Sequence, residues 1–325
     1  MERVLQAVIV AIGIPAATAG FIVLGERCLA LLPGRSSNAL RPWLWLTPGL
    51  AFLLTFLLYP SVDTLVLSFR DARSTMWVGL QNYRVIFTDA AFLTALRNNA
   101  IWVVAFPAAT VLLGIAIAIL VDRVRYENTA KALIFLPMAI SFVGAGVIWR
   151  FMYDYRPPPL PQTGTLNAFL TWAIPGFQPQ AWLVNNPPLN NLALIAAAVW
   201  LWTGFCMVVI SASLKGIPVE LFEAARVDGA SEVQVLRHVV LPSLSSTVAV
   251  VLTTMIIFAL KAFDIVYVMT NGNFDTEVIA NRMYKELFNV RDFGRASAIA
   301  IVLLAAIVPV MLLNIRRFRQ QEETR

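Results

Sequence analysis

Histidine, cysteine and lysine are all scarce in this chain of 325 residues. The single histidine, His238, excludes any two-histidine metal site such as H-E-x-x-H. The two cysteines, Cys28 and Cys206, provide neither a disulfide framework nor the spacing of metal ligands. Cys206 lies in an apolar run, where a free cysteine is typically a small packing residue. These shortages predict a protein without a metal centre and without a cofactor.

The shortage of lysine also excludes an ATP-binding loop of the P-loop type. Such a loop needs a glycine immediately before its lysine. The four lysines follow Ala130, Leu214, Leu260 and Tyr284, so the chain contains no Gly-Lys pair. If this protein uses ATP, we expect hydrolysis on separate subunits.

Charged residues make up only 14% of the chain, whereas hydrophobic residues make up 59% and the mean hydropathy is +0.73. Soluble domains carry about 25% charged residues, and a membrane-spanning helix needs roughly 20 apolar residues. The composition therefore predicts a multi-pass integral membrane protein in contact with lipid. The net charge of +6 comes from basic residues scattered through the loops, which is typical of membrane flanks rather than of nucleic-acid binding.

Seven apolar stretches are long enough to span a bilayer, and continuous runs of this kind favour helices over the alternating segments of a β-barrel. The first stretch could also be a signal peptide, but it is longer than a usual signal core and only Arg3 precedes it, so a retained helix is favoured. The predicted spans are residues 4–25, 43–68, 98–121, 131–152, 190–214, 245–268 and 295–315.

The loop charges favour one orientation. Compact basic clusters at Arg123/Arg125 and at Arg316/Arg317/Arg319 lie on the same predicted side as residues 26–42 and 215–244. The positive-inside rule then places residues 215–244 in the cytoplasm. The opposite loops, 69–96 and the proline-rich 153–189, are either connectors or surfaces that receive a partner.

The cytoplasmic loop 215–244 reads as two short helices. Pro218 is expected at the first helical position, Glu220 and Glu223 complement the helix dipole, and Asp228-Gly229 is a typical helix end. Ser231 and Gln234 form a capping box that opens the second helix, and Pro242 stands at the junction with the next span.

The first of these helices has small and apolar side chains. Leu221, Phe222 and Ala225 are predicted to share one face, and Ala224 and Ala225 would let another surface approach the backbone closely. The helix could lie against its own bundle or the lipid headgroups. Alternatively, it could dock in a groove of a soluble partner.

The same segment resembles the EAA loop of permease subunits of binding-protein-dependent ABC importers. That motif has E-A-A, then G after three residues, I after nine, and L-P after one; the only departure is Val239 for isoleucine. Further stretches resemble maltose-type carbohydrate permeases, and most of all α-glucoside permeases. They are Gly79–Tyr83, Asn98-Asn99, Trp202–Phe205, Phe263-Asp264, Tyr267–Gly272 and Asp292–Gly294 with Ala296–Ala298.

The resemblance implies an all-α fold with the six-helix core of a type I ABC importer permease. It covers most of residues 43–320, with a cytoplasmic tail at 321–325, and leaves residues 1–42 as an extra transmembrane helix and cytoplasmic linker. It also implies a second permease subunit, two ATP-hydrolysing subunits and an extracytoplasmic sugar-binding protein as partners. The residues expected to couple to the ATPase are Glu223, Ala224, Ala225, Asp228, Gly229 and Pro242.

The substrate path has fewer markers. Lys261 and Asp264 have i, i+3 spacing in the outer half of the sixth stretch, where ionisable groups are functional candidates, although a self-satisfied pair is the alternative. In similar permeases the sugar site lies on the helices that flank the EAA loop. The candidates implied here are Trp200, Gly204, Met207, Phe258, Lys261 and Asp264.

The expected function is therefore that of a non-enzymatic permease subunit of an ATP-driven sugar importer in the cell membrane, with an α-glucoside as the expected cargo. An ion-gradient-driven secondary transporter is the alternative, since Lys261 and Asp264 could serve it, but an EAA loop would have no purpose there. A membrane-embedded enzyme would need a catalytic constellation, which the sequence lacks.

Overall fold

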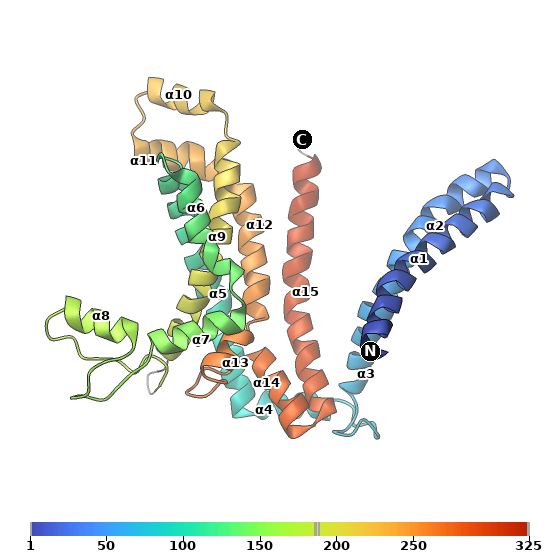
Figure 1. The fold of residues 1–325 in the computed structure, drawn as a ribbon, viewed down its shortest axis with the longest axis horizontal. Coiled ribbons are helices and arrows are strands. Elements are labelled where there is room, and N and C mark those ends of the chain that lie inside the picture. The colour runs from blue at the N-terminus through green and yellow to red at the C-terminus, as the bar shows by residue number, and fades with distance from the viewer. Residues whose placement is uncertain (1, 185–186, 188, 324–325) are drawn as a thin grey trace. The chain divides into compact units, whose positions relative to one another are not determined.

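The computed structural model describes residues 2–184, 187 and 189–323. The chain divides into two compact units, Met1–Val66 and Leu67–Arg325. Figure 1 shows the helices of both, and their bounds follow for each unit by itself.

The first unit is a helical hairpin. Helix α1 (Glu2–Ala30) turns within three residues into α2 (Gly34–Leu53), which continues through a π-helical turn (Leu54–Leu58) into α3 (Tyr59–Leu67). The hairpin is held near its turn by Glu26, which accepts hydrogen bonds from Arg41 and from the Trp45 indole. The loop expected at 26–42 is thus almost wholly helical, because a tight turn at residues 31–33 suffices to reverse the chain.

The second unit holds the remaining helices, all of which are α-helical apart from short 3₁₀ or π turns. They are α4 (Gln81–Thr88), α5 (Ala90–Val121), α6 (Glu127–Phe135), α7 (Phe142–Met152), α8 (Thr165–Ala173), α9 (Leu189–Lys215), α10 (Val219–Val227), α11 (Glu232–Val235), α12 (Leu241–Leu260), α13 (Asp264–Met269), α14 (Ile279–Tyr284) and α15 (Phe293–Glu323). The expected tail 321–325 is helical as far as Glu323, and residues 324 and 325 lie outside the described part.

Six helical stretches among the described residues are long and apolar enough to cross a membrane. They are Ala11–Ala30, Gly34–Leu67, Ala90–Val121, Leu189–Lys215, Glu232–Leu260 and Phe293–Leu313, and a bent pair formed by Glu127–Ala139 and Phe142–Met152 makes a seventh if it is one span. The prediction of a helical, multi-pass membrane protein is confirmed. The many exposed leucine and phenylalanine side chains on these helices form the surface that lipid covers.

The fourth predicted span is not one straight helix. Its two parts meet at 99°, because Pro137 lies in a 3₁₀ turn (Leu136–Ala139) and the chain is extended at Ile140 before α7 starts. The Ser141 hydroxyl caps α7 by accepting a bond from the Gly144 amide at 3.1 Å. The single apolar run predicted at residues 131–152 therefore contains parts of two helices.

Helix α9 forms the centre of the second unit. Its buried side chains include Leu194, Met207 and Ile210, which are fully enclosed. Gly114 lets α5 approach α9 closely, since a Cβ there would lie 2.7 Å from the Cys206 Cβ. Cys206 is accordingly buried as a packing residue. Figure 1 shows α10 and α11 at one end of α9 and α12, and α13 and α14 at the other.

Candidate substrate pathway and coupling helix

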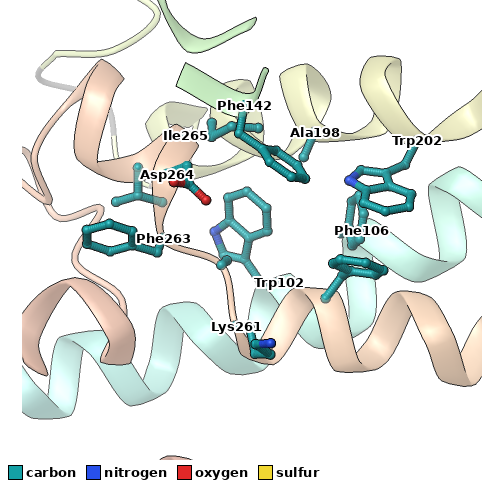
Figure 2. A pocket seen from close by; sticks show the side chains of 12 residues that line it. Trp102, Phe106, Phe142, Ala198, Trp202, Lys261, Phe263, Asp264 and Ile265 are labelled. Carbon is teal, nitrogen blue, oxygen red and sulfur yellow. The ribbon is translucent and has the colours of Figure 1, made fainter. Parts of the chain in front are cut away.

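A pocket of about 190 Å³ lies where α5, α7 and α9 meet the junction of α12 and α13 (Figure 2). We call it the aromatic pocket. Its wall combines six aromatic side chains with one cation and one carboxylate. The lining residues are Trp102, Phe106, Phe142, Ala198, Trp202, Phe258, Lys261, Ala262, Phe263, Asp264, Ile265 and Val266.

The aromatic rings pack on one another around Trp202. Its ring centroid lies 4.0 Å from that of Phe258 and 6.0 Å from that of Phe142, while the tilted rings of Trp102 and Phe106 on α5 have centroids 6.1 Å apart. Flat apolar faces held in this way bind the ring face of a ligand, whereas the charged groups orient its polar edge. The pocket therefore suits a small ring that carries polar substituents.

The charged groups of the pocket come from a break in the helix. Helix α12 ends at Leu260 and α13 begins at Asp264, so Lys261 and Asp264 do not share a helix face as their spacing suggested. No hydrogen bond or ion pair joins their side chains in the part of the chain that the structure describes, and Figure 2 shows both beside Trp102. The expectation of one helix over 245–268 is wrong. The Leu260 carbonyl at the break instead accepts a bond from the Asn99 amide at 3.2 Å.

The pocket brings together three of the six residues expected on the substrate path, Phe258, Lys261 and Asp264. Trp200 lies elsewhere, edge-to-face with Trp149 at 5.8 Å. Gly204 and Met207 are packing residues. A Cβ on Gly204 would meet the Ile134 carbonyl at 2.4 Å, so this glycine allows α6 to lie against α9, and Met207 is fully buried in the core.

Helix α10 occupies Val219–Val227 and has no buried residue. Pro218 is its N-cap rather than its first helical residue, one position earlier than expected. Phe222 and Ala225 face the bundle and pack against its core. Leu221 does not share their face, because its side chain is 47% exposed, and Glu223 and Ala224 are exposed as well.

The end of α10 is a Schellman motif. The Ala230 amide bonds to the Ala225 carbonyl and the Gly229 amide to the Arg226 carbonyl, both at 3.0 Å. Gly229 has φ +78°, a conformation in which other residues are strained, and it stands in open space. Asp228 is the C-cap. The predicted stop at Asp228-Gly229 is confirmed.

The following helix starts as the sequence indicated, but it does not stop at a loop. Ser231 and Gln234 form the expected capping box. From there α11, a π-helical turn (Leu236–Val240) and α12 run on as one stretch, Glu232–Leu260, and Pro242 lies inside it. The π turn ends two residues before the proline, as the turn Leu54–Leu58 does before Pro60, because a proline cannot continue the regular bonding of the helix. His238, in this turn, is exposed.

Comparison with known proteins decides the family. The chain matches the binding-protein-dependent transport system inner membrane component family over residues 110–316, which is more than half of its length. The chain belongs to this family. It is 55% identical over 282 residues to the osmoprotective compounds uptake permease protein GgtC of Synechocystis, covering 87% of this chain and 100% of the relative.

A second relative is the α-glucoside transport system permease protein AglF of Rhizobium meliloti, which is 46% identical over 87% of this chain and 83% of its own. Two solved structures of a bacterial alginate ABC transporter share the fold. One has a TM-score of 0.73 at 24% identity, covering 88% of this chain and 99% of that one; the other, in complex with an alginate-bound periplasmic protein, has 0.74 at 22%, covering 87% and 96%. The chain is a membrane-embedded ABC importer permease and not an enzyme.

The aromatic pocket has lining residues that the sequence did not single out. Trp102, Phe106 and Phe142 line the aromatic pocket although they come from helices far from the EAA loop in sequence. The only sequence signal nearby is Asn98-Asn99, a polar pair that opens an apolar span. Among the described residues, no group of three or more histidine, cysteine, aspartate or glutamate side chains could hold a metal ion.

The two asparagines belong to a buried polar cluster at the end of the unit remote from α10. We call it the distal polar cluster and define it as Asn98, Asn99, Glu277, Asn281 and Lys285. Asn98 donates to the Asp275 and Glu277 carbonyls at 2.8 and 2.9 Å, and Asn99 accepts from the Ile279 amide at 2.8 Å. Glu277 binds Lys285 at 2.7 Å and Asn281 at 2.6 Å. The cluster fixes the start of α14 and the segment that precedes it to α5.

Proposed function

We propose that this permease imports a small neutral α-glucoside through the aromatic pocket. The observation that carries the proposal is the combination of ring faces (Trp102, Trp202 and Phe258) with Lys261 and Asp264 at a helix break. A sugar ring has an apolar face for the aromatics and hydroxyls for the charged groups. The opposite charges of Lys261 and Asp264 leave the pocket without a net charge, which favours an uncharged cargo. The name of one relative, an α-glucoside transport system permease, agrees with this class.

The importer would pair this chain with a second, similar permease and two ATP-hydrolysing subunits, and an extracytoplasmic binding protein would deliver the sugar. One of the similar solved structures is a complex with a periplasmic protein, which supports such an assembly. A binding-protein-dependent system is also what the family description states.

Helix α10 is the proposed contact with the ATPase. Its outward face carries Leu221, Ala224 and Val227 at three-residue intervals, and the exposed fractions of Leu221 and Val227 are 47% and 87%. Apolar side chains in this pattern suit a groove on a soluble protein. The inward face is anchored by Phe222 and Ala225, so a force on α10 passes to α11 and the π turn, which continue into α12. Glu223, Asp228, Gly229 and Pro242 complete the coupling segment proposed from the sequence.

The first test is uptake of a radiolabelled α-glucoside by the assembled importer in proteoliposomes. We expect uptake that requires ATP, survives collapse of the proton gradient and is not inhibited by a charged osmoprotectant. Uptake that survives ATP depletion but fails with the gradient collapsed would favour a secondary transporter instead.

The substrate pathway is tested by Lys261→Ala. Removing the cation should raise the sugar concentration for half-maximal stimulation of the ATPase about tenfold, because a charge-assisted hydrogen bond to the sugar is lost. Lys131→Ala, which changes a lysine outside the pocket, is the matched control. An unchanged sugar dependence in Lys261→Ala would remove this residue from the pathway.

The docking surface is tested by crosslinking from Ala224→Cys, an exposed position, with Ala230→Cys as a half-buried control on the same loop. We expect capture of the ATPase subunit from Ala224→Cys in inverted vesicles. Capture of no ATPase, or labelling of this position only from the outside of intact cells, contradicts the proposed coupling role.

A further inference from the structure

A second pocket lies on α5 and α9, which are two of the helices that line the aromatic pocket. It has a volume of about 240 Å³ and shares no lining residue with the aromatic pocket; we call it the polar pocket. It is formed by α5, the start of α9 and the segment between α13 and α14. Its lining residues are Arg97, Asn98, Ile101, Pro187, Asn191 and Asp275.

The polar pocket contains an unused hydrogen-bond donor. Asn191 is 2% exposed, and its Oδ1 accepts a bond from the Trp102 indole at 2.8 Å, whereas its Nδ2 has no partner. Buried polar atoms are nearly always paired, and an unpaired one calls for a ligand or an ordered water. Asn98, beside it, has its amide fully engaged with the Asp275 and Glu277 carbonyls, so Asn191 is the donor left over for a ligand.

The charges of the polar pocket form one ion pair, in which Arg97 contacts Asp275. Because these charges cancel, the pocket favours a neutral ligand over an anion or a cation. It offers donors from Arg97 and Asn191 and acceptors from Asp275, which is the set that binds hydroxyl groups. At about 240 Å³ it is smaller than the roughly 300–1,000 Å³ typical of drug-sized ligands, so one ring would fill it.

Trp102 stands between the two pockets. Its ring lines the aromatic pocket, while its indole N–H is bonded to Asn191 of the polar pocket. On α9, Asn191 precedes Ala198 by seven residues, which corresponds to about 10 Å along a helix. The polar pocket is therefore displaced toward the end remote from α10, and a ligand arriving from that end meets it before it meets the aromatic pocket.

We propose that the polar pocket is a separate subsite, which holds one hydroxyl-rich neutral ring before that ring passes Trp102. The assignment rests on the proposed function for its ligand class, but it uses residues that the proposed pathway does not. In this subsite Asn191 Nδ2 donates to a hydroxyl oxygen of the ring, and the Arg97–Asp275 pair supplies the remaining bonds.

The test uses one reporter cysteine in each pocket of the assembled importer. Ile101→Cys reports on the polar pocket and Ala262→Cys on the aromatic pocket, and mass spectrometry of this chain measures their alkylation by a neutral maleimide. With wild-type residues elsewhere, saturating methyl α-glucoside should slow alkylation at both positions by fivefold or more.

The decisive result is a double dissociation. Arg97→Met should abolish protection of Ile101→Cys and leave that of Ala262→Cys, whereas Phe258→Ala should do the reverse. If either substitution abolishes protection at both reporters, the two pockets are one site and the inference is wrong. Absence of protection at Ile101→Cys while Ala262→Cys is protected also overturns it, but leaves the proposed function intact.

A conservative pair of variants examines the unpaired donor itself. Asn191→Asp keeps an acceptor for the Trp102 indole and removes the amide donor, so we expect half-protection of Ile101→Cys to require about tenfold more methyl α-glucoside. Asn190→Asp is the control, because Asn190 is equally buried and lies outside the pocket lining, and its amide nitrogen is bonded to the Phe274 carbonyl so that the atom it leaves unpaired is the Oδ1 acceptor. An equal shift in both variants would assign Asn191 a structural role only.

Discussion

The two ends of the second unit satisfy their polar groups in opposite ways. At the end remote from α10, the distal polar cluster is buried, with Asn98, Asn99 and Asn281 each no more than 3% exposed and Glu277 6% exposed. At the α10 end, Glu232 bridges Arg123 at 2.8 Å and Arg226 at 3.8 Å, and all three side chains are more than half exposed.

The distal end satisfies its buried polar groups with hydrogen bonds inside this chain, whereas the α10 end exposes its ion pairs and an apolar helix face. Buried polar bonds are costly to lose, since each unpaired group keeps its full desolvation penalty. Exposed ion pairs contribute little, and the apolar face of α10 has no cover within the described chain. We infer that the distal end is a rigid frame for the pathway, whereas the α10 end is finished by its partner.

The largest effect on stability is expected from Asn99→Leu. This change leaves the Ile279 amide and the Leu260 carbonyl without their partner, at a cost of about 3 kcal/mol for two buried groups. Thermal unfolding in detergent measures it, with Asn273→Ala as an exposed control. A melting temperature equal to that of the control would show that the distal polar cluster does not stabilise this end of the permease.

A smaller effect on stability but a large one on transport is expected from Gly229→Trp. The left-handed backbone at this position costs a non-glycine residue about 1 kcal/mol, while the open space around it accepts the side chain. We expect normal expression, ATP hydrolysis that continues, and uptake reduced tenfold or more. Gly229→Ala separates backbone strain from bulk, and normal uptake by Gly229→Trp would contradict a coupling role for the helix end.

The smallest effect is expected from Glu232→Gln. It removes both exposed ion pairs of the α10 end, and pairs of this kind contribute from near zero to about 1 kcal/mol, so we expect less than about 0.5 kcal/mol in the free energy of unfolding. Measurement in low and high salt is the check. A salt-dependent loss as large as that of Asn99→Leu would remove the distinction between the two ends.

Local sequence patterns predicted the α10 segment in detail. The helix end at Asp228-Gly229 and the capping box of Ser231 and Gln234 involve only residues within one helical turn of each motif. The local sequence was therefore enough to predict their geometry. The prediction that Leu221 shares a face with Phe222 and Ala225 was wrong, because the sequence of a nine-residue helix does not show which face turns inward. Contact with the core turned Phe222 and Ala225 inward.

The aromatic pocket was harder to predict because its lining residues meet across helices. Hydropathy gave no sign that α12 ends at Leu260, since Lys261 and Asp264 are only two charged residues in a long apolar run. At that end the Leu260 carbonyl accepts a hydrogen bond from the side-chain amide of Asn99, which lies more than 150 residues earlier in the chain. Trp102 and Phe142 line the pocket for the same reason.

Hydropathy, short capping motifs and the EAA pattern by themselves determined that this chain is a helical membrane permease in which residues 215–244 contain two short capped helices. Each of these signals depends on near neighbours and on the solvent that surrounds a helix. Tertiary structure alone decided where the long helices break and which side chains enclose a pocket. Those features depend on hydrogen bonds and packing between distant segments, which no local pattern records.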